Sequence, residues 1–146
     1  MKNLLYTIHN LFLASTETVS TTLRHALLIF LKYPEVKDKL HEEIDRVIGQ
    51  DRMVNMEDKF NMPYTQAVIH EVQRFCDIAP FNVPHMGTDV YTLFCTVHRD
   101  STQFSTPYTF NPNHFLDENG QFKKSDAFVA FSIVCACRFV PDFQYM

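Results

Sequence analysis

The stretch PYTQAVIHEVQRF, residues 63–75, predicts the helix around which the rest of the chain is organised. Pro63 suits the first turn of a helix, because its missing N–H would have no helical partner there. Apolar side chains then recur at three- and four-residue steps, which places them on one face: Tyr64, Ala67, Val68, Val72 and Phe75. Glu71 falls on the same face, where an unpaired carboxylate is costly to bury. Arg74 follows one turn later, so the two predict a buried ion pair, with an ordinary surface pair as the alternative.

Upstream of this stretch, the spacing of apolar residues predicts two more helices. The first runs from about Leu4 to Lys32, which is roughly 43 Å at 1.5 Å per residue. A helix of that length must cross a domain or lie inside a larger one. The second begins at Pro34 and ends near Gly49, a plausible terminator. Its apolar face is formed by Val36, Leu40, Ile44 and Val47.

The segment Ala14–Thr18 (ASTET) interrupts the apolar stripe of the first expected helix with small and polar groups. Threonine is a poor helix former, so we expect packing against another element to hold the helix there. The carboxylate of Glu17 beside the hydroxyl of Thr18 would suit proton relay in a dry pocket. A notch where another element crosses closely is the alternative.

Downstream, residues 90–97 (VYTLFCTV) predict the one strand of the chain. Asp100 to Ala130 is expected to be a loop held by spaced aromatic residues: Phe104, Phe110, Phe115, Phe122 and Phe128. The pattern therefore indicates a single, mainly helical unit without internal repeats.

Composition excludes several classes of protein. The 146-residue chain has a formal net charge of −4, which does not provide the basic surface that nucleic acid requires. With only 3 glycines, a glycine-rich phosphate loop is excluded, and no stretch is apolar for long enough to span a membrane. The 4 cysteines are too few and too uneven for a disulfide scaffold and indicate either a reducing compartment or thiols with another role.

Two short patterns approach metal-site motifs without completing them. His70 and Glu71 begin the zinc-protease pattern, but Arg74 stands where the second histidine is needed, and arginine does not ligate zinc. Cys135 and Cys137 are spaced as C-x-C with no clustered ligands nearby, which favours small buried side chains over zinc. We therefore expect no metal site built from these residues.

Five motifs, taken in order, resemble the C-terminal part of a cytochrome P-450. Ala14–Thr18 resembles the A-G-x-[DE]-T signature of the distal helix, and Glu71–Arg74 resembles the E-x-x-R motif. Val83–His85 resembles a propionate-binding P-H pair, Phe110–Phe115 the meander motif, and Phe131–Ile133 the opening of the cysteine loop. Among the cytochromes P-450, the sequence most resembles the microsomal family two of vertebrates and, within that family, the olfactory-type subfamily G.

The resemblance implies the fold. Residues 1–146 would form a partial cytochrome P-450 domain, mainly α. This incomplete C-terminal portion would contain the long distal helix, two further helices, one short strand and a loop-rich meander.

The resemblance also implies roles for individual residues. Glu17 and Thr18 would deliver protons to iron-bound oxygen, and Ala14 would lie over the haem face. His85 would donate a hydrogen bond to a propionate, and residues 78–83 would line the substrate pocket.

A polar triad is implied as well. Glu71, Arg74 and His114 would join the third helix to the meander, with His114 in the place of the usual arginine.

The cysteine loop departs from the family signature F-x-x-G-x-R-x-C-x-G. Counted from Phe131, the two glycines are replaced by Val134 and Val140, and the arginine by Ala136. Arg138 stands at the position of the iron-binding cysteine, and it can supply no thiolate. Cys137 stands one residue before the position of the iron-binding cysteine. If Cys135 took that position instead, the glycine and the arginine of the signature would both be missing.

From these departures we expect an inactive remnant of a haem-thiolate monooxygenase whose relatives act on small lipophilic, steroid- or xenobiotic-type substrates. Haem would be the family cofactor but is not expected to bind here, and NADPH–cytochrome reductase would be the family partner. The resemblance implies the endoplasmic reticulum membrane, while a chain without the anchor is expected in the cytoplasm. Two alternatives stay open: residual haem binding with weak monooxygenase activity, and a non-enzymatic helical interaction fragment.

Overall fold

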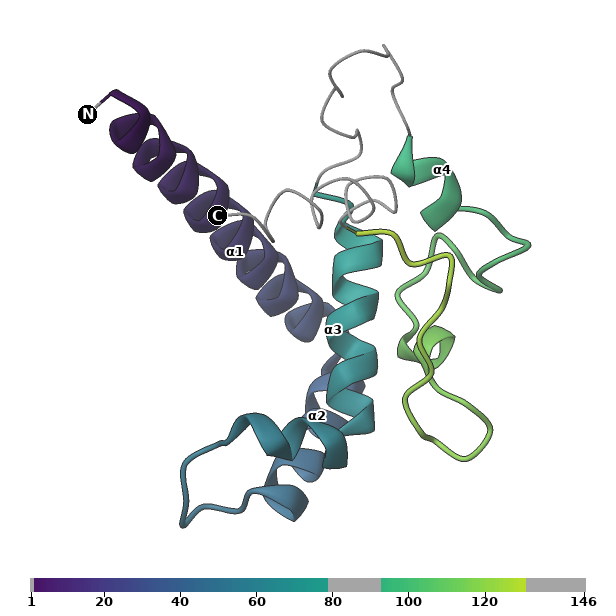
Figure 1. Ribbon diagram of the computed structural model, residues 1–146. Coiled ribbons are helices and arrows are strands. Elements are labelled where there is room, and N and C mark those ends of the chain that lie inside the picture. The colour runs from purple at the N-terminus through teal and green to yellow at the C-terminus, as the bar shows by residue number, and fades with distance from the viewer. Residues whose placement is uncertain (1, 79–92, 131–146) are drawn as a thin grey trace.

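A computed structural model describes residues 2–78 and 93–130, and this part of the chain is mainly helical (Figure 1). Its elements are the α-helices α1 (Lys2–Lys32), α2 (Pro34–Val47), α3 (Pro63–Cys76) and α4 (Phe94–His98), and the 3-10 helices η1 (Met56–Asn61) and η2 (Pro112–Phe115). The mainly helical class and the three long helices expected from the sequence are confirmed. Proline begins both α2 and α3, as the sequence predicts.

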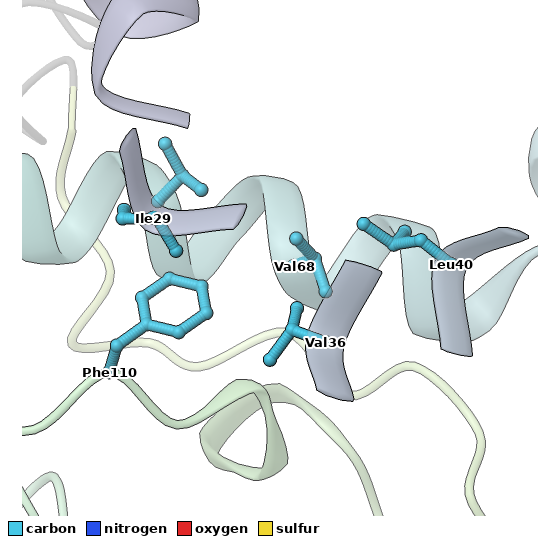
Figure 2. Packing of buried hydrophobic residues seen from close by; sticks show 6 residues of the cluster. Ile29, Val36, Leu40, Val68 and Phe110 are labelled. Carbon is cyan, nitrogen blue, oxygen red and sulfur yellow. The ribbon is translucent and has the colours of Figure 1, made fainter. Parts of the chain in front are cut away.

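Helix α3 lies between the other long helices and the C-terminal loops (Figure 1). On one side it packs against α2 and the end of α1, in a buried apolar cluster shown in Figure 2. The members of this cluster are Ile29, Val36, Leu40, Val68, Val72 and Phe110. On its other side, Ala67 joins a second cluster with Phe104 and Phe115 from the loop segment. Both clusters depend on α3, so this helix organises the core.

The prediction of a strand at residues 90–97 is wrong for the part that the structure describes, because Phe94–His98 form the short helix α4. Residues 90–92 lie outside the described part of the chain. The Thr96 hydroxyl donates to the carbonyl of Leu93 at 2.7 Å and stabilises the first turn. At the other end, the Arg74 guanidinium donates to the carbonyl of His98 at 2.7 Å. These local and tertiary bonds override the β-propensity of the sequence.

The N-terminal part of α1 is exposed from Asn3 to Ser20, and in Figure 1 it extends away from the other helices. The packing expected at Ala14–Thr18 is therefore absent from the described part of the structure. Hydroxyl groups instead bond back along the helix, as Ser15 does to the carbonyl of Leu11 at 2.7 Å. None of the described helices has the length and apolar character that a membrane span requires.

Candidate functional site

The most completely buried polar group in the described structure is the pair Glu71 and Arg74, whose side chains are both 0% exposed. Both project from α3, three residues apart. Arg74 Nε donates to Glu71 Oε2 at 2.8 Å, and Arg74 Nη2 donates to Glu71 Oε1 at 2.7 Å. This fork-to-fork arrangement is the strongest geometry available to an arginine and a carboxylate. It answers the question left by the sequence, because the pair is buried and does not lie on the surface.

Arg74 also donates hydrogen bonds to backbone carbonyl groups from outside α3. Its Nη1 donates to the carbonyl of His98 at 2.7 Å and to that of Pro107 at 3.0 Å. The guanidinium group stacks over the ring of Phe104, 4.9 Å from the ring centroid. One side chain thus connects α3 to the end of α4 and to the loop that follows.

Glu71 accepts further hydrogen bonds from the segment around η2. The backbone N–H of Asn111 donates to Glu71 Oε1 at 2.9 Å, and His114 Nδ1 lies 3.3 Å from both carboxylate oxygens. Burial by itself would raise the pKa of Glu71. The hydrogen bonds from Arg74, His114 and Asn111 outweigh it and hold this pKa below its ordinary value, so the carboxylate is ionised at neutral pH.

The hydrogen bonds of His114 define which of its ring nitrogens carries the proton. The backbone N–H of Thr106 donates to His114 Nε2 at 3.3 Å, so Nε2 is an acceptor. The proton of the neutral ring therefore lies on Nδ1, from which it is donated to Glu71. The arrangement leaves the carboxylate fully bonded and enclosed, which suits it to holding segments together. It offers no free acid or base for a substrate.

The other residues that the sequence singled out are not gathered around this network. Ala14, Glu17 and Thr18 lie on the exposed part of α1. The Thr18 hydroxyl donates to the carbonyl of Ala14 at 2.6 Å, so it is bonded within its own helix. The structure thus keeps the distal motif apart from the buried network.

Several expected site residues lie outside the described residues. His85 and the rest of its P-H motif fall within residues 79–92, as does most of the proposed pocket segment 78–83. The cysteine loop, with Cys135, Cys137 and Arg138, falls within residues 131–146.

Sequence reasoning missed Glu43 of α2. Its carboxylate accepts hydrogen bonds from the backbone N–H groups of Tyr64 at 3.1 Å and Thr65 at 2.7 Å, at the start of α3. It thereby satisfies N–H groups that have no partner within the helix and lies at the positive end of the helix dipole. The sequence signal that could have revealed this cap is Met62, the residue at the N-cap of α3. Methionine has no side-chain group that caps a helix, so the cap must come from another part of the chain.

Sequence reasoning also missed Arg99. Its Nη2 donates to the carbonyl of Phe75 at 3.0 Å, near the end of α3, and its Nη1 donates to that of Pro107 at 3.1 Å. Pro107 therefore receives hydrogen bonds from both Arg99 and Arg74. No pattern in the sequence distinguishes this arginine from one on the surface.

Comparison with known proteins gives a consistent set of similarities. A family model described as Cytochrome P450 matches residues 1–133. The chain is 57% identical to cytochrome P450 2F2 of Mus musculus in an alignment that covers 90% of this chain and 30% of that protein. It is 54% identical to cytochrome P450 2F3 of Capra hircus, with the same two coverages. It is also 54% identical to cytochrome P450 2A13 of Homo sapiens, over 91% of this chain and 30% of that protein. The chain therefore spans about a third of the length of these relatives.

Proposed function

Because this chain belongs to the cytochrome P450 family, we propose that it is an inactive remnant of a haem-thiolate monooxygenase. One observation carries the proposal. Counted from Phe131, the family signature places its iron-binding cysteine where this sequence has Arg138.

The chemistry of that position supports inactivity. A cysteine thiolate donates electron density to the iron and favours cleavage of the O–O bond. The guanidinium of Arg138 carries a permanent positive charge and has no lone pair to offer a metal. Val134 replaces a glycine that allows close approach of the backbone, and Ala136 replaces an arginine that would pair with a propionate. The substitutions act together against haem binding.

Neither cysteine of the described residues belongs to the cysteine-loop motif of the family. Cys76 lies on α3, and burial raises the pKa of its thiol to about 11, so it is not a thiolate at neutral pH. Cys95, the other described cysteine, lies on α4.

For the triad of Glu71, Arg74 and His114 we propose a structural role that is retained after catalytic activity has been lost. Its contacts join α3 to η2 and α4. A chain that has lost its iron ligand would still need this network to fold. For Glu17, Thr18, Ala14 and His85 we propose that the family roles are vestigial.

The same proposal covers cofactor, partner and location. Haem would not be retained, so electrons from NADPH–cytochrome reductase, the family partner, would have no iron to reduce. Small lipophilic substrates of the family would not be oxidised. Family resemblance supports the endoplasmic reticulum as the location, which fractionation of cells expressing the chain would test.

The haem content of the purified full chain tests this function. The chain would be expressed in cells supplied with a haem precursor, and bound haem would be measured per polypeptide. We expect far less than one haem per chain. One haem per chain, lost in Cys137→Ser and kept in the control Cys95→Ser, would replace the proposal with the residual haem-binding alternative.

Exposure of α1 favours a second candidate, a non-enzymatic interaction fragment. Leu4, Leu11 and Phe12 are between 64% and 67% exposed, and exposed apolar surface of this extent marks interaction sites. The variants Ile8→Glu and Leu11→Glu should abolish any specific partner binding in a pull-down and leave the unfolding free energy unchanged. Binding that survives both substitutions would exclude α1 as the interaction surface.

A further inference from the structure

His98, the last residue of α4, is buried against the segment that leads toward the C-terminus. Its side chain is 2% exposed. The backbone N–H of Val129 donates to His98 Nε2 at 3.3 Å. The imidazole ring also stacks on Phe128, with ring centroids 6.0 Å apart and planes inclined by 21°. One histidine therefore contacts two successive residues of that segment.

The hydrogen bond from Val129 assigns the protonation state of this ring. An acceptor nitrogen carries no proton, so neutral His98 holds its proton on Nδ1. Nδ1 lies 3.4 Å from Asp77 Oδ1, outside hydrogen-bond geometry, and is a buried side-chain nitrogen without a hydrogen-bond partner among the described residues. Because Nδ1 is already protonated, an added proton can go only to Nε2, the atom that faces the N–H of Val129.

Charged groups surround His98 on several sides. Asp77, at the C-terminal end of α3, faces Nδ1 and favours the protonated ring, while Arg74 of α3 and the neighbouring Arg99 disfavour it. Burial is the largest influence, and together with the two arginines it holds the pKa of His98 below its ordinary value. His70 of α3 also lies near the segment, with its ring centroid 4.9 Å from that of Phe128.

We propose that His98 is a pH-sensitive latch that holds residues 127–130 against α4 and α3 when neutral and releases them when protonated. Protonation places an N–H on Nε2 opposite the N–H of Val129, so the hydrogen bond is replaced by repulsion between two donors. It also leaves a buried cation close to Arg74 and Arg99, which water would solvate if the segment opened.

The direction of the pH effect follows from the lowered pKa. The latched form binds fewer protons than the open form, so it is favoured at high pH and weakened as the pH falls below 6.5, the ordinary value for histidine. This device is independent of the function proposed above, because it uses neither haem nor the residues of the cysteine loop.

The first test needs only the unmodified chain. Nitrogen-15 NMR of the imidazole rings distinguishes the two neutral tautomers, and a pH titration follows their protonation. We expect His98 to be the Nδ1–H tautomer at pH 7, and the amide signal of Val129 to shift with the same apparent pKa as the His98 ring, below 6.5. An Nε2–H tautomer, or a Val129 signal that does not follow His98, would overturn the latch.

The second test compares variants by hydrogen exchange at the Val129 amide, corrected for the intrinsic pH dependence of exchange. Between pH 7 and pH 5, we expect protection in the unmodified chain to fall, because the open segment binds the additional proton more readily than the latched one. In His98→Gln, whose amide oxygen can accept from Val129 and does not titrate, protection should not change with pH. Two controls, His70→Gln and the exposed His41→Gln, should retain this loss.

Any of three results would overturn the latch. They are an unmodified chain with no loss of protection, a loss that persists in His98→Gln, and a loss that disappears in His70→Gln. If His98→Gln does not fold, the tautomer and titration of the unmodified chain decide.

Discussion

Two of the family motifs in the described part of the chain have different surroundings. The Glu71-to-Arg74 motif on α3 is sealed, and its side chains bond to segments 24 to 43 residues further along the chain. The Ala14-to-Thr18 motif on α1 is exposed, and its Thr18 hydroxyl bonds within the same helix. Both stretches are recognisable in sequence, yet only the first contributes to the folding of this chain.

The difference separates what a motif does for structure from what it does for chemistry. A buried arginine and carboxylate leave an uncompensated charge when either is removed, so selection for folding alone preserves them. An exposed threonine can be replaced at little cost. A chain that has lost its catalytic ligand would therefore keep the α3 motif for stability, while the α1 motif would be free to diverge.

Arg74→Met should have the largest effect of any substitution considered. It leaves Glu71 buried without its partner and frees the carbonyls of His98 and Pro107, so we expect a loss of about 3–5 kcal/mol in unfolding free energy, or failure to fold. Urea unfolding followed by circular dichroism measures it. The control Arg24→Met, on the exposed side of α1, should change the free energy by less than about 0.5 kcal/mol. Equal effects for the two variants would remove the distinction between the two regions.

The next largest effect is expected from lowering the pH, which should destabilise the α3 region. The hydrogen bonds to Glu71 hold its pKa below the ordinary value of 4.5, so it contributes stability above that pH and loses it as the pH falls through the folded-state pKa. Urea unfolding of the unmodified chain should show a steep loss of free energy below about pH 5. In Glu71→Gln the starting free energy should be lower and this part of the curve flatter. A variant curve parallel to that of the unmodified chain would assign the acid loss to other groups.

Glu43→Ala should have a smaller effect, because it removes a cap and leaves the core intact. The N–H groups of Tyr64 and Thr65 lose their acceptor, and we expect about 1–2 kcal/mol of destabilisation. The matched control is Glu42→Ala, one residue earlier on the same helix and exposed, which should be close to neutral in the same thermal unfolding experiment. If the two alanine variants have the same melting temperature, the cap does not stabilise α3.

Thr18→Val should have the smallest effect, within about 0.5 kcal/mol, because its hydroxyl bonds only to the carbonyl of Ala14 in an exposed stretch. Thermal unfolding measures it against Thr65→Val, whose hydroxyl donates to Glu43 at 2.7 Å and should cost more. A Thr18 variant that is the less stable of the two would mean that the α1 motif is packed in solution.

Much of the fold could be predicted from local patterns. Pro34 and Pro63 mark the starts of α2 and α3, and the spacing of apolar residues gives their buried faces. Helix α4 could not be predicted, since residues 94–97 have β-propensity and the helix is fixed partly by an arginine from α3. Propensity is weaker than such tertiary contacts.

The candidate site was predictable only in part, for a similar reason. The Glu71–Arg74 contact is visible at a spacing of three residues, whereas His114 lies 43 residues from Glu71 and is suggested only by family resemblance. Glu43 and His98 act on segments more than 20 residues away, and no sequence period encodes such contacts. Residues of this kind are identified only from the folded structure.

The absorption spectrum of the ferrous carbonyl complex tests the central claim, that no thiolate of this chain reaches haem iron. The purified full chain would be mixed with haem, reduced and exposed to carbon monoxide, with Arg138→Cys as the matched variant. We predict no thiolate-type Soret band for the unmodified chain. Such a band in the unmodified chain would contradict an inactive remnant and would show that one of its own cysteines binds the iron.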